Sequence, residues 1–197
     1  MTPPPLDKKD YRFHRVADCA ILLAGGAHFF YIFLFLFLKI PLLPLVNVFS
    51  TLIWIACFFL NRTGLRKTGI FLGFGEILLH AAITVVLVGW PAGFHVYIIC
   101  LAPFIFFIPF PKRTPQLLLL LFIAVVYGGL FLYGIWNPPR YAVPDLVLWT
   151  LGCYNVAVLF LSLGLMALYY EKAVAEAELA HAIAHAGGQP LTMKLSE

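Results

Sequence analysis

The chain has 197 residues, of which 62% are apolar and only 11% are charged. A soluble domain has about 25% charged residues, so this composition excludes an ordinary water-soluble protein and indicates a polytopic membrane protein. The net charge of +4 does not indicate a nucleic-acid-binding protein, because the basic residues stand in short clusters between apolar runs. We therefore expect the lipid bilayer, and no nucleic acid, as a partner.

A polar, proline-rich N-terminal tail, expected in the cytoplasm over residues 1–16, precedes six apolar runs. These runs cover residues 17–38, 44–60, 68–88, 93–110, 116–136 and 145–170. Each run is close to the ~20 residues that cross a ~30 Å hydrocarbon core as a helix. The sequence therefore predicts an all-α fold, a bundle of six transmembrane helices over residues 17–170.

The character of the chain changes after Tyr170. Residues 171–186 are rich in Ala and Glu, which favour helix strongly. We expect the sixth helix to continue through them into the cytoplasm as a transducing helix. Gly187 and Gly188 should end this helix, so residues 187–197 are expected to form a flexible tail.

The basic residues predict the orientation of the chain. All Lys and Arg residues except Lys39 and Arg140 fall on one side of the predicted bundle. The positive-inside rule places that side in the cytoplasm. Both termini are then cytoplasmic, as an even number of spans requires.

Several polar side chains lie inside the apolar runs, where they are costly unless they are paired or functional. Glu76 and His80 are four residues apart and share one helix face. His28 and His80 both lie about 12 residues from the inner end of their runs, roughly 18 Å at helical rise. Asn155 falls at a similar depth, and His95 lies near the outer boundary. These five residues form the candidate ligand or sensor cluster.

Three interpretations of this cluster are open. The polar groups could link helices and fix their register by hydrogen bonds. A buried Glu–His pair could instead sense a ligand or a proton, because its protonation states are coupled. Finally, His28 and His80 could ligate haem or a metal ion, as in a membrane redox protein. A small transporter is a further alternative, although no matched pair of broken helices is visible.

Small residues mark the points where helices could approach closely. Gly25, Gly26, Gly128 and Gly129 are candidates for such packing, together with the polar Asn47. The four cysteines all fall within predicted spans and form no CxxC motif, so we expect no disulfide framework.

A set of short motifs resembles a known module. His28 precedes Asn47 and Ser50 in the second run, and Asn61-Arg62-Thr63-Gly64 follows in the inner loop. Glu76 and His80 come next, and then Gly89-Trp90, Gly93-Phe94-His95 and Tyr97. This set is similar to the six-helix N-terminal membrane module of bacterial class III nucleotide cyclases and of some diguanylate cyclases. The similarity covers residues 20–110 in detail and the last two runs only by general pattern.

The resemblance implies a sensory membrane anchor in a bacterial inner membrane that passes a signal down its last helix. It also implies a homodimer, since class III cyclases build their active sites between two catalytic domains. No Gly-Gly-Asp-Glu-Phe motif and no cyclase metal-binding aspartates follow the last helix. We therefore expect no enzyme activity from this chain, and a cytoplasmic catalytic domain that acts in cis or in trans.

Overall fold

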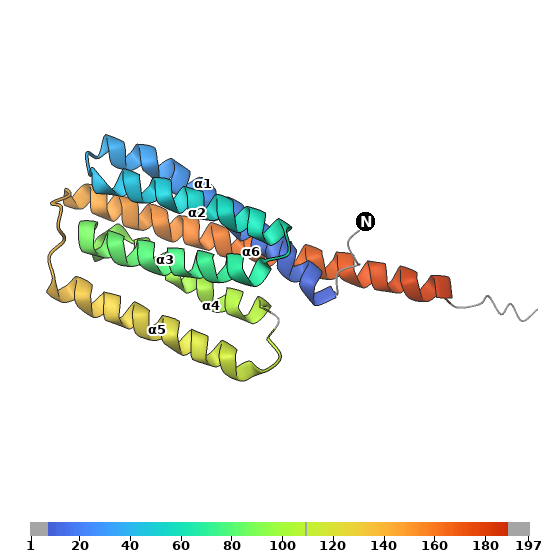
Figure 1. Cartoon of the computed structure of the whole chain (residues 1–197). Helices are drawn as coiled ribbons and strands as arrows, with labels where there is room; N and C mark the ends of the chain where they lie inside the picture. Colours follow the sequence, from blue (N-terminus) through green and yellow to red (C-terminus); the bar gives the residue numbers. More distant parts are fainter. Residues whose placement is uncertain (1–7, 109, 189–197) are drawn as a thin grey trace, which may run out of the picture.

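The computed structural model describes residues 8–108 and 110–188, and these form a bundle of helices (Figure 1). The helices are α1 (Lys8–Phe37), α2 (Leu42–Arg62), α3 (Arg66–Val88), α4 (Tyr97–Phe107), α5 (Arg113–Trp136) and α6 (Asp145–Gly188). Two short 3₁₀ helices, η1 (Trp90–Ala92) and η2 (Phe94–Val96), join α3 to α4. Residues 8–108 and 110–188 contain no strand, so the fold is all-helical as predicted.

Five helices are long and apolar enough to cross a membrane. The segments are Ala17–Phe37, Leu42–Arg62, Arg66–Val88, Arg113–Trp136 and Asp145–Glu176. The fourth predicted span, residues 93–110, is shorter than expected, because its apolar helical segment covers only Phe94–Phe106. The α-helical part, α4, has 11 residues, which is about 16 Å at helical rise and half of a hydrocarbon core.

The fourth segment is short because the turn before it lies inside the bundle. Ala92 is fully buried, and Asn155 Nδ2 on α6 donates a hydrogen bond to its carbonyl oxygen at 2.7 Å. Gly93 adopts the left-handed conformation, with φ of 80°, which favours glycine. Asn155 is ten residues into α6, about 15 Å from its start. The turn between the third and fourth predicted spans therefore packs against α6 about two to three turns from the start of that helix.

The loop between α5 and α6 covers the end of α3. The backbone N–H of Arg140 donates to Val86 O at 3.0 Å, and that of Tyr141 donates to Leu87 O at 2.9 Å. These bonds satisfy carbonyls that the last turn of a helix leaves without intrahelical partners. The loop thus fixes the relative position of α3 and α6 at one end of the bundle.

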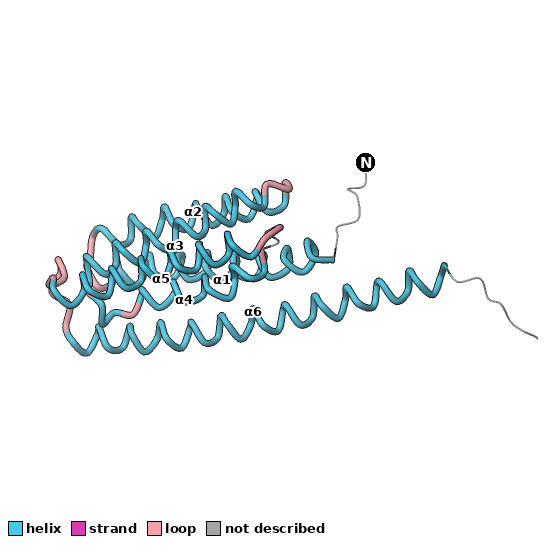
Figure 2. Tube along the Cα trace, turned by 90° about the horizontal axis from the view of Figure 1, so that it is seen from below, coloured by secondary structure: helices cyan, strands magenta, loops and turns pink. Residues whose placement is uncertain are grey.

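Two of the long helices differ in how they pack. Half of the span window of α3 is buried inside the structure, whereas only 6% of the window of α5 is. Helix α6 packs along the bundle and then continues well past the ends of the other helices (Figures 1 and 2). Helix α3 is therefore central in the bundle, α5 is peripheral, and α6 extends away from the bundle.

The first helix begins before the predicted start of the membrane domain, and the last helix extends through the predicted transducing segment. Helix α1 begins at Lys8, within the predicted tail of residues 1–16, and residues 1–7 lie outside the described part. Helix α6 runs without a break through residues 171–186 and ends at Gly188. The remainder of the predicted C-terminal tail, residues 189–197, also lies outside the described part.

Candidate functional site

Three helices bring a buried carboxylate and its partners together. Glu76 on α3 is only 5% exposed. Trp54 on α2 donates its indole N–H to Glu76 Oε2 at 2.9 Å. His28 on α1 places its Nε2 atom 3.3 Å from Glu76 Oε1. We call His28, Trp54, Glu76 and His80 the Glu76 network.

The hydrogen bonds around His28 fix where its protons are. Asn47 Nδ2 donates to the backbone carbonyl of Leu43 at 2.8 Å, so the amide oxygen of Asn47 faces the other way. That oxygen lies 3.0 Å from His28 Nδ1, which must therefore be the protonated nitrogen that donates to it. His28 Nε2 and Glu76 Oε1 would repel each other as two acceptors, so one proton lies between them. The pair is electrically neutral whichever atom holds that proton, and neutrality lowers the cost of burial.

His80 lies one helical turn from Glu76 and contacts His28. The two imidazole rings meet edge to face, with 4.5 Å between centroids. His80 is 6% exposed, and its Nε2 atom has no hydrogen-bond partner within residues 8–108 and 110–188. A buried polar atom without a partner is costly. His80 Nε2 is thus the open polar position of the network.

The arrangement of the two histidines does not fit haem ligation. A bis-histidine haem holds its iron, and hence the porphyrin plane, between the two imidazole rings. Here the rings of His28 and His80 are in direct contact, which leaves no room for a porphyrin. Within the part of the chain that the structure describes, no group of three or more His, Cys, Asp or Glu side chains could hold a metal ion.

Asn155 belongs to a separate polar group. Its side-chain oxygen accepts hydrogen bonds from the hydroxyls of Tyr31 and of Tyr97, the second at 2.8 Å. The two tyrosine oxygens are themselves 3.1 Å apart. Together with the bond to Ala92, these contacts join α1, α4, α6 and the buried turn. Asn155 therefore does not contact Glu76 or His80, although sequence placed all three in one cluster.

His95 lies apart from the other candidates. Its ring stacks on Trp90, with 3.4 Å between centroids and 14° between planes, and Tyr127 of α5 contacts it edge to face. The His95 Nδ1 atom has no hydrogen-bond partner in the described residues. The position is consistent with an aromatic contact between the buried turn and α5.

The glycines that pack closely are mostly not those that sequence singled out. A Cβ atom at Gly25 would lie 3.4 Å from Trp54 Cβ, which is an ordinary contact. Gly26, Gly128 and Gly129 would meet nothing within 4 Å, so within this chain they are not close-packing points. The tight positions are instead Gly69, Gly73, Gly93, Gly134 and Gly152. Sequence could not separate the two sets, because it does not show which face of each helix is inward.

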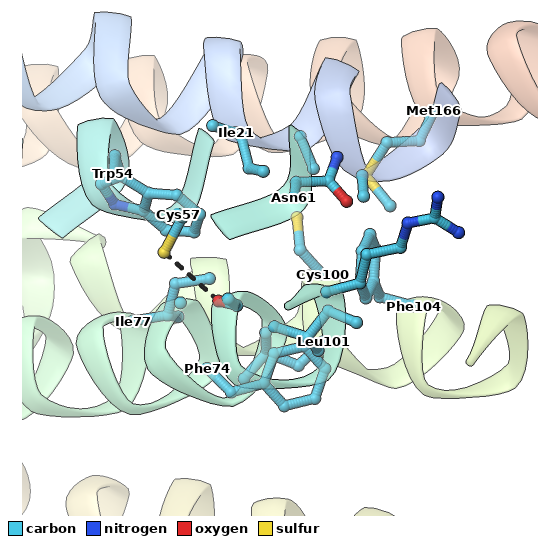
Figure 3. Close-up of a pocket in the computed structure, with 16 residues that line it drawn as sticks. Ile21, Trp54, Cys57, Asn61, Phe74, Ile77, Cys100, Leu101, Phe104 and Met166 are labelled. Atoms are coloured by element: carbon cyan, nitrogen blue, oxygen red, sulfur yellow. Dashed lines mark hydrogen bonds between the residues drawn. The ribbon is translucent and has the colours of Figure 1, made fainter. Parts of the chain in front are cut away.

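Two adjoining cavities lie beside the Glu76 network, and we call them together the cavity. The first part contains about 720 Å³ of unfilled space, some of it open to the surroundings, and is lined by His28, Glu76 and His80 together with Val158, Ser162 and Met166 of α6. The second part, shown in Figure 3, lies beside Trp54 and Met166 and extends to Asn61 and Arg66. The side chains of Ala20, Trp54, Ile77, Cys100 and Met166 line both parts. One face of α6 therefore forms a wall of this cavity.

Sequence reasoning missed two participants in the polar groups, Trp54 and Tyr31, and gave Tyr97 only as part of the motif set. Tryptophan and tyrosine were counted as apolar residues, yet each has a hydrogen-bonding group that needs a partner when buried. One signal was available for Trp54. Asn47, Ser50 and Trp54 follow helical spacing on α2, and all three are buried.

Comparisons of this chain with known protein families, with curated proteins and with solved structures gave no match. The class that the fold itself defines is a helical membrane protein with a buried polar network.

Proposed function

We propose that this chain is a non-catalytic sensory module of a bacterial inner membrane, with six crossings and both termini in the cytoplasm. It passes the state of the Glu76 network through α6 to a cytoplasmic effector of the nucleotide-cyclase type. One observation carries the proposal: the helix that forms a wall of the cavity is also the helix that leaves the bundle (Figure 2).

The contacts of α6 support a path from the cavity to the cytoplasm. Val158, Ser162 and Met166 line the cavity beside the Glu76 network. One to three turns closer to its start, Asn155 ties α6 to α1 and α4. A ligand or proton that changed the network would therefore change what α6 packs against. A differential affinity equivalent to about 1–3 kcal/mol suffices for regulation by population shift.

The charge distribution and the motif resemblance support the remaining features of the proposal. Within residues 8–108 and 110–188, the basic residues other than Lys39 and Arg140 lie toward the end of the bundle from which α6 projects (Figure 1). In the proposed topology, the fourth crossing consists of the buried turn 89–93 and α4, with η1 and η2 in place of part of the helix. A homodimer follows from the resemblance to class III cyclases, whose catalytic sites need two chains.

To test the proposal, a class III catalytic domain is fused after Ala186. Residues are then inserted into α6, so that the catalytic domain is rotated about the helix axis relative to the bundle. Each inserted residue rotates the following helix by about 100°. Two alanines inserted after Ala177 should change basal cyclase activity several-fold, whereas seven, which restore the phase almost fully, should leave it near the parent value.

A second arm tests the network itself. Glu76→Gln should abolish the response of the fusion to pH, because the amide cannot exchange the proton that Glu76 and His28 share. Leu121→Ala, an exposed position on α5, is the matched control and should respond like the parent. Equal activity in the two-residue and seven-residue insertions, together with a normal response of Glu76→Gln, would contradict the proposed function.

A further inference from the structure

The open end of the Glu76 network faces a cavity that is mostly apolar. His80 Nε2 is buried without a hydrogen-bond partner, and Glu76 Oε1, which shares a proton with His28 Nε2 at 3.3 Å, has a second lone pair that no described residue uses. Both residues line the cavity. A group placed there would meet one carboxyl oxygen and one imidazole nitrogen among mostly apolar side chains, since the hydroxyls of Tyr31 and Tyr97 are already bonded to Asn155.

The lining of the cavity extends along α3, so its length suits an extended alkyl chain better than a compact ring system. On α3 the lining residues run from Arg66 to His80, at the spacing of one helix face. Fourteen residues of helix correspond to about 21 Å. Trp54 lies where the two parts of the cavity join, and it is held there by its bond to Glu76. The cavity is therefore long, with the Glu76 network at one end, Asn61 and Arg66 at the other, and mostly apolar side chains between them.

The net charge of the Glu76 network determines which head group of a bound ligand would be favoured. The His28–Glu76 pair is neutral overall, so it provides no net charge to balance an ionic head group, and an unbalanced charge in such a site is strongly unfavourable. A hydroxyl has one donor hydrogen and two acceptor lone pairs, so it can accept from His80 Nε2–H and donate to Glu76 Oε1 at the same time.

We infer that this cavity binds a neutral single-chain lipid alcohol. Its hydroxyl bonds His80 Nε2 and Glu76 Oε1, and its alkyl chain extends past Trp54 towards Asn61. The ligand contacts α6 at Val158, Ser162 and Met166, so its binding biases the helix that leaves the bundle. That regulatory consequence rests on the proposed function, whereas the binding does not.

The test uses the full chain in lipid nanodiscs and three probes of equal length: photoreactive diazirine derivatives of hexadecan-1-ol, hexadecanoic acid and hexadecane. The alcohol should label cavity residues such as Ile77 and Met166, identified by mass spectrometry, and unlabelled hexadecan-1-ol should compete. His80→Phe keeps the ring contacts and removes Nε2, so it should weaken competition by the alcohol about tenfold.

Two further variants test lipid binding in the cavity even if His80→Phe misfolds. Cys100→Phe fills the wall that both parts of the cavity share and should abolish labelling by the alcohol. Cys153→Phe, on the exposed face of α6, is the matched control and should leave labelling unchanged. Preference for the acid over the alcohol, as expected if Arg66 held a carboxylate, would overturn the inference. Equal labelling in Cys100→Phe and Cys153→Phe would overturn it too.

The cyclase fusion separates this inference from the proposed function. Labelling in the cavity with no change in cyclase activity upon addition of hexadecan-1-ol would support the lipid site and contradict its role in signalling. An activity change that depends on the phase of α6, without labelling in the cavity, would support the proposed function and overturn the lipid site.

Discussion

Helices α3 and α5 are almost equally apolar, yet the structure uses them differently. Half of the span window of α3 is buried, against 6% of that of α5. The helices differ in their minority residues. Helix α3 has two inward glycines, a carboxylate, an imidazole and a threonine hydroxyl on its buried side: Gly69, Gly73, Glu76, His80 and Thr84. In α5 only Gln116 and Ile123 are buried.

This difference shows which residues organise a bundle inside a membrane. Lipid tails are as apolar as leucine, so apolar side chains alone give no preference for protein over lipid. Polar groups need partners, and small residues permit close approach of backbones. The buried helix is therefore marked by its exceptions to the apolar pattern. Substitutions matched between the two helices test this conclusion.

The largest effect is expected when the carboxylate is removed from the centre of α3. Glu76→Leu leaves the Trp54 indole N–H and His28 without their partner, and should lower the free energy of unfolding by about 3 kcal/mol. On α5, Gln116 donates only long hydrogen bonds of 3.3 and 3.4 Å, so Gln116→Leu should cost less than about 1 kcal/mol. Reversible unfolding in mixed micelles measures both.

The isosteric variant Glu76→Gln sharpens this prediction. Its amide can donate to His28 Nε2 and accept from Trp54, so it should retain most of the stability that Glu76→Leu loses. Equal losses in Glu76→Leu and Gln116→Leu would show that the network contributes no more to stability than a peripheral polar contact.

The next largest effect concerns the buried turn. A Cβ atom at Gly152 would lie 2.5 Å from the carbonyl oxygen of Pro91, which is backbone and cannot move aside easily. Gly152→Ala should therefore destabilise by about 2 kcal/mol. Gly164→Ala on the same helix meets nothing within 4 Å and should be neutral or stabilising, because alanine favours helix. A neutral Gly152→Ala would mean that the turn does not pack against α6 in the membrane.

A smaller effect is expected at the contact of α3 with α2. A Cβ atom at Gly73 would lie 3.0 Å from the Trp54 ring, which is held by its bond to Glu76. Gly73→Ala should cost about 1 kcal/mol as the ring shifts, and the fluorescence of Trp54 should change. Gly128→Ala on α5 has open space around it, so its unfolding free energy should not fall. A larger loss of unfolding free energy in Gly128→Ala than in Gly73→Ala would contradict the assignment of α3 as the central helix.

The smallest effect is expected at the Asn155 group. Tyr97→Phe removes the hydroxyl that donates to Asn155 and lies near Tyr31. A single interhelical hydrogen bond contributes about 0.6 kcal/mol in a membrane, and Tyr97→Phe should lose that amount. Tyr133→Phe, at an exposed position on α5, is the control and should unfold like the parent chain. A loss above about 2 kcal/mol would instead indicate that this group is the main link between α1, α4 and α6.

Sequence was sufficient for much of the candidate site. The i, i+4 spacing of Glu76 and His80 and the matched depth of His28 predicted a close approach, and the structure places His28 against both. Asn155, predicted at a similar depth, bonds Tyr31 and Tyr97, which line the same cavity, and not Glu76 or the histidines. Depth along a helix can be counted from sequence, whereas the direction that a side chain faces depends on which helices are neighbours.

Hydropathy and length alone determined that this chain forms apolar helices suited to a membrane, because a backbone in lipid must satisfy its own hydrogen bonds. The helix-favouring composition after Tyr170 likewise determined that α6 continues past the bundle. Tertiary structure decided the rest. The turn after α3 lies inside the bundle because Gly93, Gly152 and Asn155, distant in sequence, create the space and the hydrogen bond that hold it. Long-range contacts of this kind depend on helix rotation, which an almost uniformly apolar sequence does not specify.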